Sequence, residues 1–237
     1  MKAVILAGGT GTRLAPYTRV FPKPMMPIGD KTILEVLIAQ LKRAGVDEVI
    51  ITVGHLAGLM RAFFKDGRDY GLQIRYSYED HPLGTAGPIS LVDGLDDTFI
   101  VSNGDVLTLL DIAHLVAFHK SQGDSLATIA THHREVHIDL GVIESDNDHT
   151  VTGYIEKPTL EYLVSMGIYV FDPGILDYIP YNERLDFPDL VLKLLADGKR
   201  VTHYRYDGYY QDLGRPEDYE QACVDFETMR SQFLMED

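Results

Sequence analysis

The feature that most constrains this chain is a short apolar strand that runs directly into a glycine-rich loop near the N-terminus. The strand is predicted over residues 2–7, and three glycines follow it: Gly8, Gly9 and Gly11. Glycine has no Cβ, so such a backbone can approach an anion closely, and its successive N–H groups form an anion-binding concavity. Arg13 ends the loop, and Lys23 lies between two prolines further along, which adds two positive charges. The pattern predicts a phosphate-binding site beyond the first strand.

Two better-known phosphate loops do not fit this stretch. A dinucleotide-binding fingerprint requires a third glycine where the chain has Leu14. A P-loop requires Gly-Lys-Ser/Thr, whereas this chain continues as Gly11-Thr12-Arg13. An oxidoreductase on a dinucleotide-binding fold is therefore the weakest functional interpretation.

The first half of the chain alternates apolar runs with helical patterns. Strands are predicted over residues 2–7, 48–53, 73–78 and 99–102, and helices over 31–44, 55–65, 85–92 and 111–122, with Asp111 capping the last. This alternation is typical of a doubly wound α/β sheet whose strands are mostly parallel. Ligands bind such sheets beyond the carboxyl ends of the strands. We therefore expect the glycine loop and Asp105 at the same edge.

The second half is richer in strands. They are predicted over residues 127–131, 140–144, 151–156, 166–171 and 201–205, with short helices over 173–179 and 188–196 and a final helix from about Pro216. No linker or internal repeat interrupts the sequence. We expect a single α/β domain over residues 1–237, with a nucleotide-binding half (1–122) and a substrate-binding half (123–237).

Charge and cysteine content exclude several classes of protein. Lysine and arginine number 21 against 36 acidic residues, a net charge of −15. Nucleic acids and anionic membranes need a basic face, so neither is an expected partner. Cys223 is the only cysteine, which excludes an intrachain disulfide and a cysteine-based zinc site. The N-terminal apolar run is too short for a signal peptide, and a cytoplasmic location is expected.

Five motifs give the chain a family resemblance. They are Gly8-Gly9-Thr10-Gly11-Thr12-Arg13-Leu14 with Pro22-Lys23-Pro24, then Leu83-Gly84-Thr85-Ala86-Gly87, Asn103-Gly104-Asp105, Glu156-Lys157-Pro158 and Asp212-Leu213-Gly214. In this order and spacing they resemble the signature of the sugar-1-phosphate nucleotidylyltransferases, over nearly the whole chain. The resemblance implies a single Rossmann-like domain, with a mixed, mostly parallel central sheet flanked by helices.

The resemblance also implies a reaction. The phosphate of a sugar 1-phosphate attacks the α-phosphorus of a nucleoside triphosphate, and pyrophosphate leaves. The nucleophile needs no general base, because the second pKa of a phosphate monoester is about 6. The difficulty is to bring two polyanions together, so positioning and charge neutralisation dominate. Arg13, Lys23 and Asp105 are the implied catalytic residues.

The implied binding residues form three sets. The nucleotide-binding set is Leu6, Ala7, Gly8, Gly9, Thr10, Gly11, Thr12, Arg13, Lys23, Glu79, Pro82, Gly84, Thr85 and Asp105. The sugar-phosphate-binding set, in the second half, is Gly141, Glu156, Lys157, Gly167 and Asp212. Asp105 and Asp212 are the implied ligands of Mg²⁺, which binds few protein carboxylates and otherwise prefers phosphate oxygens and water.

The substrate pair is less constrained. The segment from Glu79 to Gly87 is most similar to that of enzymes that use GTP with mannose 1-phosphate or a heptose 1-phosphate. Thymidylyl or uridylyl transfer to glucose 1-phosphate or another sugar 1-phosphate stays open. Ser165 stands where relatives commonly have asparagine, which leaves the sugar undecided. A non-catalytic nucleotide-sugar-binding regulatory subunit is the alternative from another class, although the chain keeps Arg13, Lys23, Asp105 and Lys157.

Two side-chain groups have a simpler interpretation. His132, His133 and His137 would suit a metal only on a helix, and their surroundings are typical of strand and loop, so a surface or interface role is expected. Four tyrosines precede Asp212 and are assigned to core and interface: Tyr204, Tyr206, Tyr209 and Tyr210. Self-association as a homodimer is left open.

Overall fold

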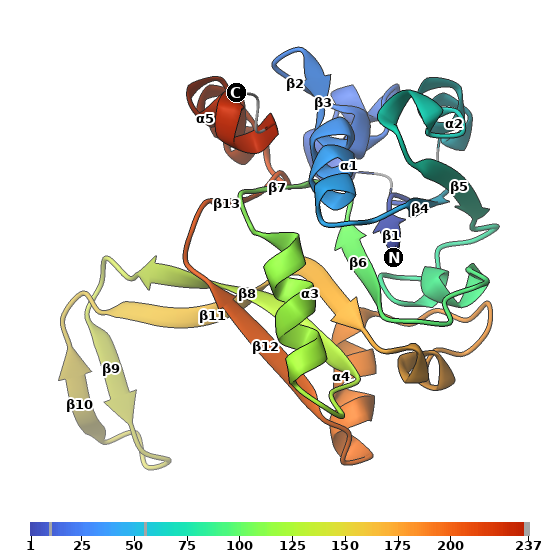
Figure 1. Ribbon diagram of the computed structural model, residues 1–237. Coiled ribbons are helices and arrows are strands. Elements are labelled where there is room, and N and C mark those ends of the chain that lie inside the picture. The colour runs from blue at the N-terminus through green and yellow to red at the C-terminus, as the bar shows by residue number, and fades with distance from the viewer. Residues whose placement is uncertain (10, 55, 235–237) are drawn as a thin grey trace.

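A seven-stranded sheet forms the centre of the molecule (Figure 1). The computed structural model describes residues 1–9, 11–54 and 56–234. The strand order is β12 (Val201–Tyr206), β8 (Ala127–His137), β11 (Thr159–Phe171), β6 (Phe99–Asn103), β1 (Lys2–Leu6), β4 (Glu48–Val53) and β5 (Gln73–Tyr78). Only β11 in this sheet runs antiparallel to its neighbours. The predicted α/β fold with a mixed, mostly parallel sheet is confirmed.

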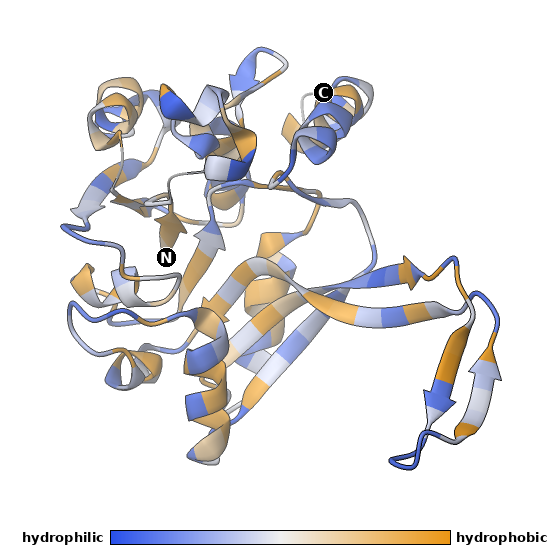
Figure 2. Cartoon of the chain, turned by 180° about the vertical axis from the view of Figure 1, so that it is seen from behind, coloured by the Kyte–Doolittle hydropathy of each residue, from blue (hydrophilic) through white to orange (hydrophobic). Residues whose placement is uncertain are grey.

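Helices cover both faces of the sheet. One face packs against α1 (Ile33–Arg43), α2 (Ala57–Phe64) and α3 (Ile112–Ser121). The other packs against α4 (Phe187–Ala196) and two short 3-10 helices, η5 (Gly87–Leu91) and η6 (Pro173–Tyr178). β1 shows why the chain takes this form, because Ala3 and Ile5 enter one core and Val4 enters the other. Figure 2 shows the resulting concentration of apolar residues in the central strands.

Two helix starts are fixed by side-chain caps. At α1, the Thr32 hydroxyl accepts a hydrogen bond from the Glu35 N–H at 3.2 Å, while the Glu35 carboxylate accepts one from the Thr32 N–H at 2.7 Å. At α3, the Asp111 carboxylate accepts from the His114 N–H at 2.9 Å, as the sequence predicted. Such caps satisfy N–H groups that have no partner within the helix.

A third core joins the C-terminal helix to the body. α5 (Pro216–Leu234) buries Phe226 and Phe233 against α1 and a small antiparallel ladder, β7 (Val106–Thr108) with β13 (Tyr210–Asp212). β2 (Pro27–Ile28) and β3 (Lys31–Thr32) form a second short ladder beside it. The β7–β13 ladder brings the end of the chain back to the edge of the sheet where β6 ends.

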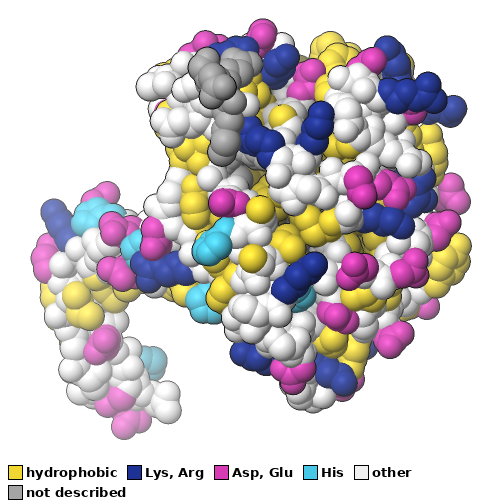
Figure 3. Space-filling model, viewed as in Figure 1, with side chains coloured by type: hydrophobic (Ala, Val, Ile, Leu, Met, Phe, Trp, Pro, Cys, Tyr) yellow, Lys and Arg dark blue, Asp and Glu magenta, His cyan; other side chains and the backbone are white. Residues whose placement is uncertain are grey.

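An arm projects from the sheet (Figures 1 and 3). We define the arm as residues 133–165, which include the outer parts of β8 and β11 and the hairpin of β9 (Val142–Ser145) with β10 (Val151–Ile155). A register shift separates Ser165 from Tyr169, and β11 pairs with β6 only from Ile168 onward. The arm carries exposed apolar side chains: Val136, Leu140, Ile143, Val151, Tyr154, Ile155, Leu160, Tyr162 and Leu163.

On the arm, the strands predicted over 140–144 and 151–156 are confirmed as β9 and β10, whereas the extent of β8 and β11 was not predicted. The strand predicted over 127–131 extends to His137, and the strand predicted over 166–171 begins already at Thr159. Both are longer than predicted because β8 and β11 continue to pair with each other beyond the sheet. The helices predicted over 85–92 and 173–179 are 3-10 helices.

Within the described residues, no helix combines the length and the apolar character needed to cross a membrane.

Candidate functional site

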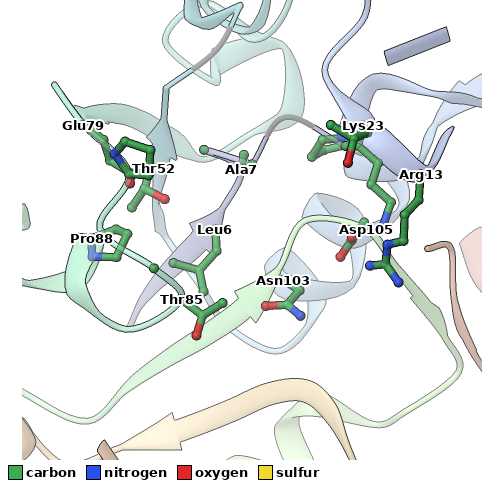
Figure 4. Close-up of a pocket in the computed structure, with 17 residues that line it drawn as sticks. Leu6, Ala7, Arg13, Lys23, Thr52, Glu79, Thr85, Pro88, Asn103 and Asp105 are labelled. Carbon is green, nitrogen blue, oxygen red and sulfur yellow. Dashed lines mark hydrogen bonds and ion pairs between the residues drawn. The ribbon is translucent and has the colours of Figure 1, made fainter. Parts of the chain in front are cut away.

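A cleft of about 470 Å³ opens at the carboxyl ends of β1, β4 and β6 (Figure 4). It is lined by Leu6, Ala7, Gly8, Gly9, Gly11, Thr12, Arg13, Lys23, Pro24, Thr52, Glu79, Pro82, Gly84, Thr85, Pro88, Asn103 and Asp105. Figure 4 shows Lys23, Arg13 and Asp105 at one end, and Glu79, Thr52 and Pro88 at the other. The cleft is therefore chemically asymmetric along its length.

Lys23 and Asp105 form the centre of the charged end. Lys23 begins the 3-10 helix η3 (Lys23–Met25) and is only 8% exposed. Its ammonium donates to the Asp105 carboxylate, and the Asp212 carboxylate lies 3.9 Å from the same nitrogen. Two carboxylates thus converge on one cation. A pair of carboxylates of which one, Asp105, lines the cleft suits Mg²⁺, which completes its octahedron with phosphate and water oxygens.

The β7–β13 ladder explains how Asp212 reaches Asp105. Asp212 pairs with Val106, and the Leu213 N–H donates to the Asp105 carbonyl at 3.2 Å. Gly214 then passes close to the Arg13 guanidinium, since a Cβ at Gly214 would lie 3.1 Å from its Nη1 atom. Residues nearly the whole chain length apart therefore build one cluster of two positive and two negative side chains.

A contact with Thr18 fixes the conformation of the glycine loop. The Thr18 hydroxyl donates to the Gly11 carbonyl at 2.7 Å. Gly11 has a positive φ of 61°, and a Cβ there would lie 2.9 Å from the Thr18 methyl carbon. Only glycine adopts this conformation without strain and also fits against Thr18. Thr10 lies outside the described residues.

Glu79 dominates the opposite end of the cleft. One of its carboxylate oxygens accepts a hydrogen bond from the Leu83 N–H at 3.2 Å. The other lies against Gly8, where a Cβ would come within 1.9 Å of it. Partial burial raises the pKa of Glu79, and the Leu83 N–H opposes this effect in part. A carboxylate with unused acceptor capacity therefore faces the cleft far from Lys23.

The cleft contains every described residue of the predicted nucleotide-binding set. Sequence reasoning did not place four other lining residues there, namely Pro24, Thr52, Pro88 and Asn103. Pro24 and Asn103 lay within the recognised motifs. Thr52 gave a weak signal in the sequence, because it is a polar residue in the apolar strand β4. Pro88 gave none. The role of each residue in binding stays a prediction.

The predicted sugar-phosphate-binding set divides into two groups. Gly167 lies beside the cleft, where a Cβ would come within 2.4 Å of the Asn103 amide nitrogen, and its φ is 72°. The nearby Ser165 hydroxyl accepts from the Gly167 N–H at 3.3 Å and donates to the Tyr169 hydroxyl at 3.1 Å. Asp212 belongs to the Lys23 cluster, as described above. Gly167 and Asp212 therefore lie next to residues that line the cleft, Asn103 and Lys23, without lining it themselves.

The other three lie on the arm. The Tyr154 hydroxyl donates to the Glu156 carboxylate at 3.2 Å and packs on Gly141, where a Cβ would come within 2.0 Å of the hydroxyl oxygen. Lys157 is exposed and has a positive φ of 47°, uncommon for a residue other than glycine. Gly141, Glu156 and Lys157 do not line the cleft in this conformation. Their predicted contact with a sugar phosphate remains a prediction.

The histidines lie on a strand, as the sequence predicted. The ring Nδ1 of His132 is 3.0 Å from the Tyr206 carbonyl oxygen. His133 Nε2 lies 3.4 Å from a carboxylate oxygen of Glu161, and Glu135 joins the same group. Sequence reasoning found no acidic cluster near these histidines. The structure supplies two carboxylates, because Glu161 comes from the facing strand.

Relatives share this chain's sequence over most of its length. A uridylyltransferase of Synechocystis, named for UTP and glucose 1-phosphate, is 37% identical over 94% of this chain and 62% of its own length. A mannose-1-phosphate guanylyltransferase of Mycobacterium tuberculosis is 36% identical over 94% of this chain and 64% of its own. The chain thus spans less than two thirds of the length of each of these curated relatives.

Solved structures share its fold. A candidate glucose-1-phosphate thymidylyltransferase of Bacillus anthracis superposes with a TM-score of 0.76 at 26% identity, over 94% of each chain. HddC of Yersinia pseudotuberculosis superposes with a TM-score of 0.71 at 28% identity, over 95% of this chain and 99% of its own. HddC has also been solved in complex with GMP-PN.

The sequence model of the family described as nucleotidyl transferase matches residues 2–228. This range includes the whole cleft and the arm. The motif resemblance, the fold and the relatives agree with that match, and the chain belongs to the nucleotidyl transferase family.

Proposed function

We propose that this chain is a Mg²⁺-dependent sugar-1-phosphate guanylyltransferase, which converts GTP and a sugar 1-phosphate into a GDP-sugar and pyrophosphate. The observation that carries the choice of GTP is Glu79 at the end of the cleft opposite Lys23. Family membership and the charged end support nucleotidyl transfer itself. Relatives named for guanylyl and for uridylyl transfer are both similar, so the base is argued from the residues.

The chemistry of Glu79 favours guanine. An ionised carboxylate only accepts hydrogen bonds. Guanine presents two adjacent donors on its Watson–Crick edge, N1–H and N2–H. Uracil and thymine present one donor between two carbonyl oxygens, which a carboxylate would repel. Because a partly buried polar group left without a partner costs binding energy, a carboxylate discriminates against these bases.

The charged end suits the transfer step. A non-bridging oxygen of the sugar phosphate forms a bond to the α-phosphorus, and the bond from that phosphorus to the bridging oxygen of the β-phosphate breaks. Pyrophosphate keeps the electron pair. Arg13, the loop N–H groups and Lys23 hold the phosphates in line and neutralise the charge that the leaving group gains. Mg²⁺ held by Asp105 and Asp212 would supply further Lewis-acid neutralisation of the phosphate oxygens.

The sugar is proposed from the second half of the chain. Gly167 allows close approach beside Asn103, and the arm carries Glu156 and Lys157, an acceptor and a cation of the kind that sugar hydroxyls and a phosphate require. Mannose 1-phosphate or a heptose 1-phosphate is the proposed acceptor.

Pyrophosphate release tests the proposed reaction. The protein is incubated with Mg²⁺, each of GTP, UTP, dTTP, CTP and ATP, and a panel of sugar 1-phosphates. We expect release with GTP and one sugar 1-phosphate, and none after Mg²⁺ is removed with EDTA. Release with no pair at all would instead favour a regulatory nucleotide-sugar-binding protein.

A second assay tests the metal ligands. We expect Asp105→Asn to lower kcat/KM at least about 100-fold, as removal of an electrostatic group at a reacting phosphate does elsewhere. Asp69→Asn, which removes a surface carboxylate paired with Lys65, serves as the control. Unchanged activity of the Asp105 variant would overturn the assignment of this residue.

A further inference from the structure

The wall of the cleft formed by residues 83–87 is built against a segment from the other half of the chain. The N–H groups of Ala86 and Gly87 donate to the Leu185 carbonyl at 2.9 and 3.0 Å. In return, the Leu185 N–H donates to the Leu83 carbonyl at 2.9 Å. Gly84 and Thr85, between these anchor points, line the cleft. The position of this wall therefore depends on the segment that leads into α4.

Asp186 and Thr85 exchange hydrogen bonds across this contact. The Asp186 carboxylate accepts from the Thr85 N–H at 3.0 Å and from the Thr85 hydroxyl at 3.4 Å. The Thr85 hydroxyl in turn accepts from the Phe187 N–H at 2.8 Å. Each residue therefore satisfies a backbone N–H group of the other's segment.

The direction in which Asp186 points is unusual for its place on the helix. An aspartate at the N-cap normally accepts from N–H groups in the first turn of its own helix. Asp186 occupies the N-cap of α4 and makes no such bond. Its carboxylate is turned toward the loop, and the first N–H of the helix is capped by Thr85 instead. The Asp186 carboxylate thus binds a residue 101 positions away in the sequence instead of capping its own helix.

The fit around Gly84 leaves the loop little freedom. Gly84 has a φ of 80°, and a Cβ there would lie 2.6 Å from both an Asp186 carboxylate oxygen and the Leu185 carbonyl oxygen. The backbone of Gly84 therefore lies directly on the Asp186 side chain. Movement of the carboxylate would release both the Thr85 N–H and this close packing.

We propose that Asp186 is a positioning residue for the nucleotide: it holds residues 83–87 at the distance from Glu79 and the glycine loop that the bound nucleoside requires. Asp186 itself does not line the cleft, so it acts through Gly84 and Thr85. This inference rests on the proposed binding of a nucleotide in the cleft. Asp186 thus adds a side-chain contact to the Leu185 backbone hydrogen bonds that join the two halves of the chain.

Two substitutions at Asp186 separate positioning from general stability. Asp186→Ala removes the acceptor, whereas Asp186→Asn keeps an oxygen that can accept from the Thr85 N–H. We expect Asp186→Ala to raise the Kd of Mg·GTP about tenfold, the usual scale for a lost hydrogen bond to a charged group, and Asp186→Asn to restore most of the affinity. The KM for the sugar 1-phosphate should change less than twofold. Asp172→Ala is the control, because Asp172 caps η6 through the Gly174 N–H, away from the cleft.

Hydrogen exchange of the ligand-free protein tests the contact independently of nucleotide binding. We expect faster exchange at residues 83–87 in Asp186→Ala, and exchange at the wild-type rate in Asp172→Ala. If these residues exchange at the wild-type rate in Asp186→Ala, or if the affinity for Mg·GTP is unchanged while they loosen, the positioning role is overturned. If the wild-type protein binds no nucleotide, the proposed function fails, and the exchange result reports separately on the contact.

Thr85→Val provides a coupling test, because valine keeps the shape of threonine without its hydroxyl. If the two residues act as one unit, the double variant Thr85→Val/Asp186→Ala should bind Mg·GTP no more than about twofold more weakly than Asp186→Ala alone. Independent, multiplying losses of affinity in the double variant would contradict the reciprocal arrangement.

Discussion

At the scale of single residues, the cleft is organised by the separation of its charges. Lys23 and Arg13 lie with Asp105 at one end, while the carboxylate of Glu79 lies at the other (Figure 4). A triphosphate is repelled by the Glu79 end and attracted by the Lys23 end. The charges therefore fix which way a nucleotide enters, with its base toward Glu79.

Glu79 is proposed to determine the choice of base. Glu79→Gln replaces an acceptor by an amide with one donor and one acceptor, which suits uracil better than guanine. We expect the ratio of kcat/KM for GTP over UTP to fall at least about tenfold, because hydrogen-bond mismatches in such sites cost this much or more. Asp80→Asn, an exposed neighbour outside the cleft, should keep the wild-type ratio. An unchanged ratio in the Glu79 variant would remove Glu79 from base selection.

The second residue-scale prediction follows from the raised pKa of Glu79. Burial raises the pKa of Glu79 above its ordinary value of 4.5, so the ionised form carries a cost in the folded state. That cost is fully present at neutral pH and disappears as the pH falls through the folded pKa toward 4.5. The melting temperature of Glu79→Gln should therefore exceed that of the wild type at pH 7, and the difference should vanish on acidification.

Acidification should relieve the stability cost of Glu79 but weaken the binding of GTP. Protonation of Glu79 replaces one acceptor by a donor, so the Kd of GTP for the wild type should rise as the pH falls toward 4.5. The nucleotide phosphates titrate in the same way in assays of both proteins. The Kd of GTP for Glu79→Gln should therefore lack the additional rise that comes from Glu79. Identical pH profiles for the two proteins would contradict a role for an ionised Glu79.

At the scale of elements, the glycine loop depends on the short segment that supports it. We expect Gly11→Ala to lower the free energy of unfolding by about 1–2 kcal/mol, the cost of a left-handed conformation in an L-residue, with a further loss from contact with Thr18. Gly58→Ala in α2 is the matched control, since among the described residues nothing outside the helix's own backbone and the two chain neighbours lies within 4 Å of the Cβ position there. Alanine replaces glycine inside a helix in that control, so its stability should rise. Equal behaviour of both variants in urea unfolding would contradict the account of the loop.

Elements with a strong local pattern were predictable, and those held by distant partners were not. β1 and β4 are nearly continuous apolar runs, and the Asp111 cap is a local signal. The local sequence was therefore sufficient to predict these elements. The glycine loop was likewise found from its residues. By contrast, β7 and β13 are three residues each and exist because they pair with each other. The Asp186–Thr85 contact joins two segments with no shared pattern.

On the arm, the β9–β10 hairpin was predictable, but the outer parts of β8 and β11 were not, for a related reason. Its outer strands have no strict apolar alternation, and they are extended because β8 and β11 continue to pair outside the sheet. The sequence motifs placed Glu156 and Lys157 in one site with Lys23, whereas the structure places them on the arm. Motif order along a chain carries no information on how far a hairpin projects.

At the scale of the whole molecule, the arm and the cleft must approach each other for the proposed reaction. Lys157 is exposed on the arm and cannot bind a sugar phosphate in the cleft from there. We expect Lys157→Met to raise the KM for the sugar 1-phosphate at least about tenfold, as loss of a charged hydrogen bond does, with the KM for GTP unchanged. Lys120→Met on α3 is the control.

Small-angle scattering tests the same movement directly. We expect the radius of gyration to decrease when GDP-sugar product is bound, because the arm projects from the body of the molecule (Figure 3). An unchanged radius, together with wild-type kinetics of the Lys157 variant, would show that the arm takes no part in binding the sugar phosphate.

The cleft as a whole is proposed to select GTP for transfer to a sugar 1-phosphate. The most direct test is the ratio of kcat/KM for GTP over UTP and dTTP, measured by pyrophosphate release with Mg²⁺ and the best sugar 1-phosphate. The carboxylate of Glu79 predicts a ratio above about ten. A preference for UTP or dTTP would contradict the assignment of the base, and no pyrophosphate with any pair would contradict the proposed reaction itself.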